Sequence, residues 1–509
     1  MARVYSNRLS EYTHENGGRV ALLFLLFALA IFQFINSGFN AFAVICLSPL
    51  AILFVYAAFK WKMGVFWALI IVNWFIMNRN LSIPFPVSLA DESLELLLIA
   101  IAILDARYTP HFERAWNLMF LSIMIWVGLC LIQILNDTCG LGLQINAWFT
   151  GFRLISLHLV WIILVFSLYI TDPESLIKYL RLWAILSLLS AFYTWKMIHI
   201  GLTDTENAWL HSPSNHTHLL NAGTLIRYWS TFNDAASYGC NASASAIAFL
   251  IFGITSKLKF DRIFFLLTTA IVIWGMFQSG TRTAIITFIA GFVVFLFLSK
   301  SVKILVPSAI IGGFFLFILI FTNIGNGNQQ IRRMRSAFDR KDASANVRDI
   351  NKAAIAKYMK EAPWGIGIGM LSQDIPSNNK FKKLSDIPPD SEYVYIWVRT
   401  GAIGITVFTC CIVLMFLGGC IIVLFRLRSP SLIGIGGGMC AAFVSINLGG
   451  YANQILFNYP NALTFFGGMA IVYLLPYFEP EWIKYEEKRL TQKEEKEHIK
   501  LEKRLASRV

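Results

Sequence analysis

Residues 388–404 read PPDSEYVYIWVRTGAIG and open an apolar run that continues to residue 425. Two carboxylates, Asp390 and Glu392, stand before the run, and Arg399 lies inside it. A run of this length with so few charges is typical of a membrane-spanning helix, because about 20 apolar residues cross a bilayer. A charge inside such a helix usually faces the bundle interior and marks a functional site. The stretch therefore predicts a membrane protein with a site at this end of the helix.

The rest of the chain repeats the apolar pattern. Its 509 residues are 56% hydrophobic and 14% charged, with a mean hydropathy of +0.60. A soluble domain carries about 25% charged residues. The short alternating segments of a β-barrel are missing, so we expect an all-α polytopic membrane protein with about 14 spans, within a range of about 12–14. The candidate spans are residues 20–37, 39–59, 64–77, 87–104, 115–135, 150–170, 177–199, 235–255, 262–278, 282–299, 302–322, 393–425, 432–449 and 461–478.

The formal net charge of +13 has a topological explanation. Most basic residues fall in short links between apolar runs and in the C-terminal segment. Cytoplasmic links of membrane proteins are enriched in lysine and arginine in this way. We therefore expect membrane lipid and not nucleic acid as a partner, with both termini in the cytoplasm.

The links divide the chain into three parts. Residues 1–19 are expected to form a cytoplasmic N-terminus, residues 20–478 the transmembrane domain, and residues 479–509 a charged cytoplasmic helix. Two long links, residues 200–234 and 323–391, then face the exterior. The second is expected to be a large, partly helical extracytoplasmic loop.

No metal or other cofactor is expected from the sequence. His211, His216 and His218 lie together in the first outer loop, in HSPSNHTH. Their spacing lacks a complete set of metal ligands, so a polar loop is the simpler interpretation.

The second outer loop contains a basic helix. SANVRDINKAAIAKYMKEA is capped near Ser344 and stops before Pro363. Arg348 and Lys352 recur on one helical face. A basic helix at the outer surface suits an anionic ligand, and a diphosphate is the obvious candidate. The alternative is a solvated amphipathic helix without a ligand.

Two further arginines adjoin apolar runs at the outer end. Arg282 follows a Ser-Gly turn in FQSGTRTAII, where the start of the next helix presents backbone amides to an anion. Arg227 precedes a run made unusually small by alanine, serine and glycine. Arg282 could instead snorkel to lipid headgroups, and the small residues could serve close helix packing alone.

In the opening stretch, Glu392 and Arg399 are two turns apart on one helical face, with Tyr395 between them. Their axial separation is about 10 Å, which suits two ends of one polar cleft.

Taken in order, these segments resemble the O-antigen ligase and O-antigen polymerase superfamily of bacterial cell-envelope glycan enzymes. The likeness covers about residues 225–410 and rests on four motifs. They are RYWSTFNDAASYG at 227–239, SGTRTA at 279–284, VRDINKAAIAKYMKEAPWGIGIG at 347–369 and DSEYVYIWVRTGAIG at 390–404.

The resemblance implies a metal-independent glycosyltransferase in the bacterial inner membrane, with its active site facing the periplasm. Its donor is a glycan on undecaprenyl diphosphate, and its acceptor is another glycan or a glycolipid; a chain-length regulator is a further partner of this class of enzyme. Arginine stabilises a diphosphate leaving group without a metal. The expected catalytic residues are Arg282, Arg348, Asp390 and Glu392, and the expected substrate-binding residues are Arg227, Lys352, Tyr395 and Arg399.

One residue separates two activities. Ligases of this family resemble one another in carrying a histidine where this chain has Asp390. Asp390 or Glu392 would then be the base that activates the acceptor hydroxyl. This difference favours a polymerase of lipid-linked repeat units, with the ligase as the alternative. A transporter or flippase is a third hypothesis, which charges along both ends of the core helices would favour.

Overall fold

The computed structural model describes residues 17–81, 87–105, 111–220, 225–300, 302–338 and 343–506. It divides into two units, residues 1–65 and residues 66–509. Most of the first unit is one long helix, α2 (Gly17–Lys60), and α3 (Lys62–Phe75) runs across the boundary. The predicted spans 20–37 and 39–59 therefore belong to a single helix, because the Ser37–Gly38 pair does not end it.

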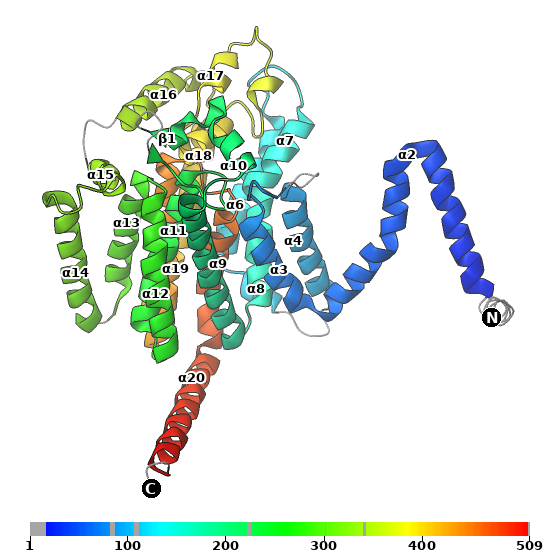
Figure 1. Ribbon diagram of the computed structural model, residues 1–509. Coiled ribbons are helices and arrows are strands. Elements are labelled where there is room, and N and C mark those ends of the chain that lie inside the picture. The colour runs from blue at the N-terminus through cyan, green and yellow to red at the C-terminus, as the bar shows by residue number, and fades with distance from the viewer. Residues whose placement is uncertain are drawn as a thin grey trace. The chain divides into compact units, whose positions relative to one another are not determined.

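The second unit is a helical bundle with one short two-stranded antiparallel sheet within the described residues (Figure 1). Its further elements are α4 (Val87–Leu104), α5 (Phe112–Ala115), α6 (Leu118–Ile132), α7 (Ile145–Phe152), the π-helical η3 (Arg153–Leu157), α8 (His158–Tyr169), α9 (Pro173–His199), α10 (Asp204–Leu210), η4 (Pro213–His218), β1 (Leu219–Leu220), β2 (Leu225–Ile226), α11 (Ala235–Thr255), α12 (Lys259–Gln278), α13 (Arg282–Leu298), α14 (Val302–Phe321), α15 (Gln329–Arg335), α16 (Ala343–Met359), α17 (Lys382–Asp386), α18 (Glu392–Ile421), η7 (Ile422–Arg426), α19 (Pro430–Ala452) and α20 (Asn461–Ala506).

Helix α11 lies at the centre of the bundle, packed against α12, α13 and α19. Nearly all its alanine, serine and glycine residues are buried. Small side chains let helix backbones approach closely, which is how membrane helices associate without a hydrophobic driving force. The close-packing interpretation of this run is therefore confirmed.

Eight helical segments of the described chain are long and apolar enough to cross a membrane, or nine if a bent pair counts as one span. The eight are Leu118–Leu135, Ile145–Tyr169, Pro173–His199, Ala235–Thr255, Lys259–Gln278, Glu392–Arg426, Pro430–Ala452 and Asn461–Gln492. The polytopic all-α class is confirmed, whereas the count of about 14 is not. One reason is that some apolar runs form short helices, such as Arg282–Leu298.

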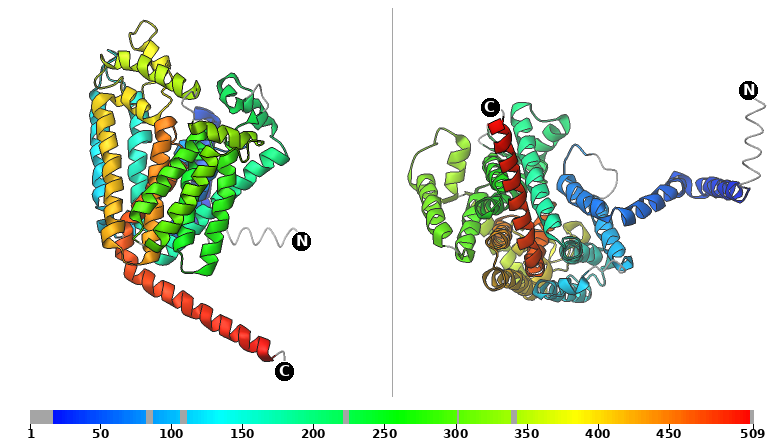
Figure 2. Two further views of the ribbon diagram at one scale, coloured as in Figure 1. Left: turned by 90° about the vertical axis from the view of Figure 1, so that its left-hand side faces the viewer. Right: turned by 90° about the horizontal axis from the view of Figure 1, so that it is seen from below.

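The C-terminal span and the charged segment after it form one helix. Helix α20 runs without interruption from Asn461 to Ala506 and passes through Pro476 and Pro480. Its charged half extends away from the bundle at the end opposite α16 (Figures 1 and 2). The predicted loops 200–234 and 323–391 both lie at the α16 end, so the tertiary structure brings these two distant segments together.

Candidate functional site

Helix α18 is broken just after Arg399. Gly401 has φ 72° and ψ −169°, a conformation that interrupts the helix. The turn at residues 363–369, which reads PWGIGIG, forms backbone hydrogen bonds to α18 on both sides of the break. The Gly367 amide donates to the Arg399 carbonyl (3.1 Å), and the Ala402 amide donates to the Pro363 carbonyl (3.0 Å). The predicted span 393–425 lies within the apolar segment Glu392–Arg426, and the break at Gly401 interrupts it near its start.

Glycine is required on both sides of this junction. A Cβ on Gly401 would overlap the Pro363 carbonyl, and a Cβ on Gly365 would overlap the Arg399 backbone. The two chain segments can meet only because neither residue has a side chain. Arg399 consequently belongs to a short helical segment before the break, and the stretch from residue 402 to residue 425 carries no charge.

Helix α16 faces this short segment across a pocket of about 430 Å³. Three predicted site residues, Arg348, Lys352 and Asp390, line the pocket. The Asn351 side-chain amide donates a 2.8 Å hydrogen bond to Asp390 Oδ2, which joins the two walls. The other lining residues are Asp349, Asn351, Ile355, Pro388, Ser391, Tyr393, Val394, Trp397, Ala402, Ile405, Thr406, Tyr451 and Ala452.

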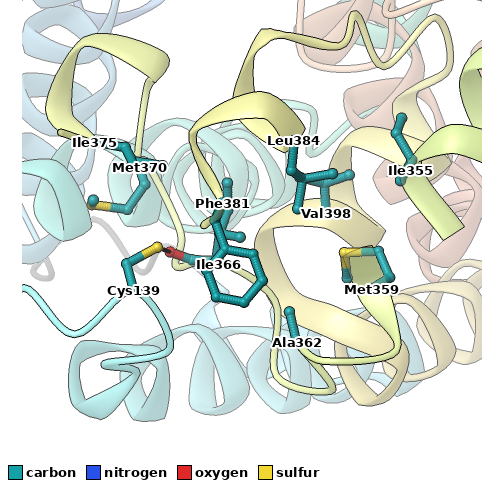
Figure 3. Close-up of a cluster of buried hydrophobic side chains, with 10 residues drawn as sticks. All are labelled: Cys139, Ile355, Met359, Ala362, Ile366, Met370, Ile375, Phe381, Leu384 and Val398. Carbon is teal, nitrogen blue, oxygen red and sulfur yellow. Dashed lines mark hydrogen bonds between the residues drawn. The ribbon is translucent and has the colours of Figure 1, made fainter. Parts of the chain in front are cut away.

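A buried hydrophobic cluster holds the pocket walls in place (Figure 3). Ile355 and Met359 of α16 belong to the cluster with Val398 of α18 and Ile366 of the glycine-rich turn. These α16 positions continue the helical stripe of Arg348 and Lys352, since residues three or four apart lie on one face. The stripe is thus apolar where α16 is anchored and basic where it lines the pocket. The remaining members of the hydrophobic cluster are Cys139, Ala362, Met370, Ile375, Phe381 and Leu384.

Several arginines gather around the turn between α12 and α13. Gly280 adopts φ 58° in this turn. Arg227 Nη2 donates to Thr281 Oγ1 (3.1 Å), and Arg333 Nε donates to the Gly280 carbonyl (2.6 Å). Arg282, the first residue of α13, donates to Ser336 Oγ (3.4 Å). The turn is therefore surrounded by three guanidinium groups.

The arginines act on one another electrostatically. Burial lowers the pKa of the Arg227 guanidinium, and the charges of Arg282 and Arg348 lower it further, while Asp234 acts in the opposite direction. The Asp234 carboxylate also caps α11 by accepting hydrogen bonds from two backbone amides. Arg348 lines the pocket and also acts on Arg227, so it links the pocket with the arginine cluster. An anion such as a phosphate would relieve this accumulation of positive charge.

Glu392 and Arg399 do not form the expected cleft. Glu392 is buried, and its Oε2 accepts a 3.0 Å hydrogen bond from the Leu456 amide in the loop between α19 and α20. The Arg399 guanidinium lies 5.2 Å from the Tyr395 ring centroid. None of the three lines the pocket. Helical spacing correctly puts Tyr395 beside Arg399, but Glu392 binds the loop between α19 and α20 instead of this pair.

Sequence reasoning missed several residues of the site. Arg333 is one of several basic residues of the second outer loop and belongs to none of the motifs, and Trp397 and Tyr451 carry no local signal that marks them. Asn351 lies three residues after Arg348 on the predicted helix, so its place on the basic face was detectable. Tyr451 lies in the last turn of α19, and only the packing of α18 on α19 brings it to the pocket.

The described histidines of the first outer loop have other partners. His218 Nε2 accepts a hydrogen bond from the Ala235 amide (3.3 Å), at the start of α11. The His211 ring nitrogen Nδ1 donates to the Asn207 carbonyl (2.9 Å). The His216 side chain lies outside the described residues. One group in the described part of the chain does have the composition of a metal site, namely Asp91, Glu95 and His158.

Residues 242–409 match the O-Antigen ligase family model. The match contains Arg282, Arg348, Lys352 and Asp390 and leaves out Arg227. No curated protein sequence matches the chain. The match covers about a third of the chain and supports the resemblance to the O-antigen ligase and polymerase superfamily. Together with the apolar helices it supports a multi-pass membrane enzyme of this type.

Proposed function

We propose that the chain polymerises oligosaccharide repeat units carried on undecaprenyl diphosphate, as in the synthesis of O-antigen, capsule or exopolysaccharide. The reaction would take place at the outer leaflet of the bacterial inner membrane, with both termini in the cytoplasm. One observation carries the proposal: Arg348 and Lys352 line one pocket with Asp390, and the charge of Arg348 also acts on Arg227 of the arginine cluster. A cationic wall and a carboxylate on opposite sides suit a diphosphate donor and a hydroxyl acceptor.

The donor side of the site is basic. Arg227, Arg282 and Arg348 would hold the diphosphate, and Lys352 would add a further charge at the pocket wall. Charge-assisted hydrogen bonds from arginine to phosphate oxygens are among the strongest in proteins. They stabilise the negative charge that develops as the leaving group departs, so the transfer step needs no metal ion.

The acceptor side of the site carries the base. The acceptor hydroxyl oxygen attacks the anomeric carbon of the donor sugar, the bond from that carbon to the phosphate oxygen breaks, and the electron pair leaves with undecaprenyl diphosphate. The hydroxyl proton passes to the Asp390 carboxylate. Tyr393 and Trp397 line the same pocket and would give the glycan apolar contact.

The other predicted residues receive supporting roles. Glu392 accepts a hydrogen bond from the backbone, so we assign it to positioning Asp390 two residues earlier. Tyr395 and Arg399 stabilise the short helical segment below the pocket.

An O-antigen ligase is the alternative, since the matched family carries that name. A ligase would move finished glycan to lipid A-core or another surface acceptor. Asp390 favours the polymerase, because ligases of this family carry a histidine there. A chain-length regulator is a further proposed partner of the polymerase. A transporter is the least favoured, because the pocket residues lie at one end of the bundle.

Purified full-length protein in nanodiscs tests the proposal with a defined repeat unit on undecaprenyl diphosphate and no energy source. A polymerase produces a ladder of longer lipid-linked chains and releases undecaprenyl diphosphate. Transfer to added lipid A-core without a ladder would establish the ligase instead. If neither product forms while labelled glycolipid crosses the membrane of proteoliposomes, the chain is a transporter.

A further inference from the structure

A second polar cluster lies inside the bundle, where α4 packs against η3 and α8. Asp91 and Glu95 stand one turn apart on α4, and His158 is the first residue of α8, directly after the π-helical segment η3. The three residues are at most 1% exposed. π-helical turns within α-helices occur frequently at functional sites. Burying a charged group is costly unless the group is paired or binds a metal ion, so the charges of this cluster need a partner.

The spacing of the ligand atoms fits a metal ion. His158 Nε2 lies 3.2 Å from Asp91 Oδ2 and 3.2 Å from Glu95 Oε1. A charge-assisted hydrogen bond would be about 2.7–2.9 Å long, and one N–H cannot serve two carboxylates equally well. Adjacent ligands of a tetrahedral zinc ion with bonds of about 2.0–2.1 Å are about 3.3 Å apart. All the ligand atoms lie within 4.8 Å of one another.

Most unsatisfied polar atoms of the cluster are acceptors. Among the described residues, both oxygens of Glu95, Oε1 of Glu92 and Oδ1 of Asn73 receive no hydrogen bond. The donors that are present serve other atoms. Asn73 Nδ2 donates to Asp91 (2.9 Å), and Arg153 Nη1 donates to Glu92 (2.8 Å). Buried oxygen atoms without donors are what a cation satisfies, whereas a hydrogen-bond network would need more donors.

The charge balance leads to the same conclusion. Asp91, Glu92 and Glu95 carry three carboxylates, and Arg153 supplies one fixed positive charge to them. A divalent cation would neutralise the remaining two negative charges while His158 stays neutral and keeps its lone pair as a ligand.

Tyr459 gives an independent indication. Its side chain is buried, with 6% exposed, and its hydroxyl has no hydrogen-bond partner among the described residues. The ring centroid lies 5.7 Å from that of His158, and the three carboxylates act on the hydroxyl electrostatically. A buried tyrosine hydroxyl usually finds a partner. A metal ion, or the water that completes its coordination, would supply one.

We propose that Asp91, Glu95 and His158 bind one divalent metal ion, with zinc as the best match. Magnesium and calcium prefer all-oxygen sites with six or more ligands, whereas zinc accepts one nitrogen and two carboxylates. None of the three ligands lines the pocket, so the ion has a structural role and the transfer step does not use it. It would pin α4 to α8 and fix Tyr459. The same loop contains Leu456, whose amide binds Glu392 beside Asp390.

Metal analysis of the purified full-length protein tests this site. After loading with zinc chloride and extensive dialysis, we expect elemental mass spectrometry to find about one zinc ion per chain. Glu95→Gln and His158→Gln should lower the zinc content at least about tenfold. His218→Gln is the matched control, because it removes another buried histidine and should leave the zinc content unchanged. Chelation with EDTA should lower the melting temperature of the wild type and not that of Glu95→Gln.

Loading with Co²⁺ gives a second measurement that uses the wild-type protein alone and therefore does not depend on whether a variant folds. Wild-type protein loaded with Co²⁺ should show the visible absorption of a tetrahedral Co²⁺ ion, and added Zn²⁺ should abolish it. A wild type that retains less than about one tenth of an equivalent of either metal overturns the proposal, and the cluster would then hold a proton instead. Equal zinc content in the wild type and both ligand variants would also overturn it.

Discussion

The Asn351 side chain donates a 2.8 Å hydrogen bond to the Asp390 carboxylate and so connects α16 with a residue two positions before the start of α18. Asn351 lies on the helix face that carries Arg348, and Lys352 is the next residue in the sequence. The bond therefore sets the distance between the basic wall of the pocket and the proposed base. It also holds one oxygen of a carboxylate that lines the pocket.

Asp390→Asn should lower the transfer rate at least about 10²-fold, because the amide cannot accept a proton from the acceptor hydroxyl. The shape of the residue and its contact with Asn351 are retained, so donor binding should be nearly unchanged. Single-turnover transfer and donor binding are measured on the same nanodisc preparation. Glu361→Gln, an exposed carboxylate paired with Lys380 in the same loop, is the control. Full activity in Asp390→Asn would remove this residue from the role of base.

Arg282→Ala and Arg348→Ala should each abolish detectable transfer, with a loss of about 10²–10³-fold or more, because charge on the leaving diphosphate is no longer stabilised. Lysine at either position should restore part of the rate, since it keeps the charge and loses the two-pronged geometry. Transfer is followed by release of undecaprenyl diphosphate. Arg332→Ala, on the exposed side of α15, should retain activity. If an alanine variant inserts normally and transfers at the wild-type rate, that arginine does not bind the diphosphate.

Gly401→Ala should destabilise the protein by about 3 kcal/mol or more, because it combines left-handed backbone strain with overlap at the Pro363 carbonyl. Helix α18 would lose the turn 363–369, and with it the pocket. The melting temperature and the monodispersity of the purified variant report the change. Gly128→Ala in α6, where a Cβ meets nothing within 4 Å, should have little effect. Equal melting temperatures for the two variants would show that the junction tolerates a side chain.

Acidification should weaken the segment around His218. Burial lowers the pKa of this histidine to about 4 from its ordinary value of 6.5, and the Arg227 charge contributes. Above about pH 6.5 the ring is neutral in both the folded and the unfolded states. As the pH falls toward 4, only the unfolded state takes up the proton, so the loop loses stability by up to about 3 kcal/mol.

Hydrogen exchange of residues 205–240 in the full-length protein measures this loss between about pH 7 and pH 4.5. His218→Gln keeps an acceptor for the Ala235 amide and cannot be protonated, so its exchange should follow only the intrinsic pH dependence of amides. A wild type with the same pH profile as the variant would contradict the prediction.

Much of the site was predictable because its residues lie close together in the sequence. Arg348 and Lys352 are one helical turn apart, so periodicity alone placed them on one face. Arg282 follows a Ser-Gly turn whose geometry is local. These signals depend only on neighbouring residues of the chain. The three side chains lie on the elements where they were predicted, and their roles stay predictions.

Other features depended on contacts that no local pattern encodes. The break at Gly401 follows from the approach of Pro363, and a Gly-x-x-Gly spacing alone is compatible with a straight helix. Glu392 and Arg399 share a helical face, but Glu392 binds the loop before α20, whereas Arg399 contacts Tyr395 of its own helical segment.

The amino-acid sequence by itself determined the membrane class, the helical content and the basic face of α16, since apolar length and helical periodicity are properties of consecutive residues. Only the tertiary structure decided that Asp390 meets Asn351 and that Glu392 binds a backbone loop. It also brought His158 to Asp91 and Glu95. The physical reason is that these pairings depend on which helices pack together, and residues far apart in the chain carry no periodic record of their contact.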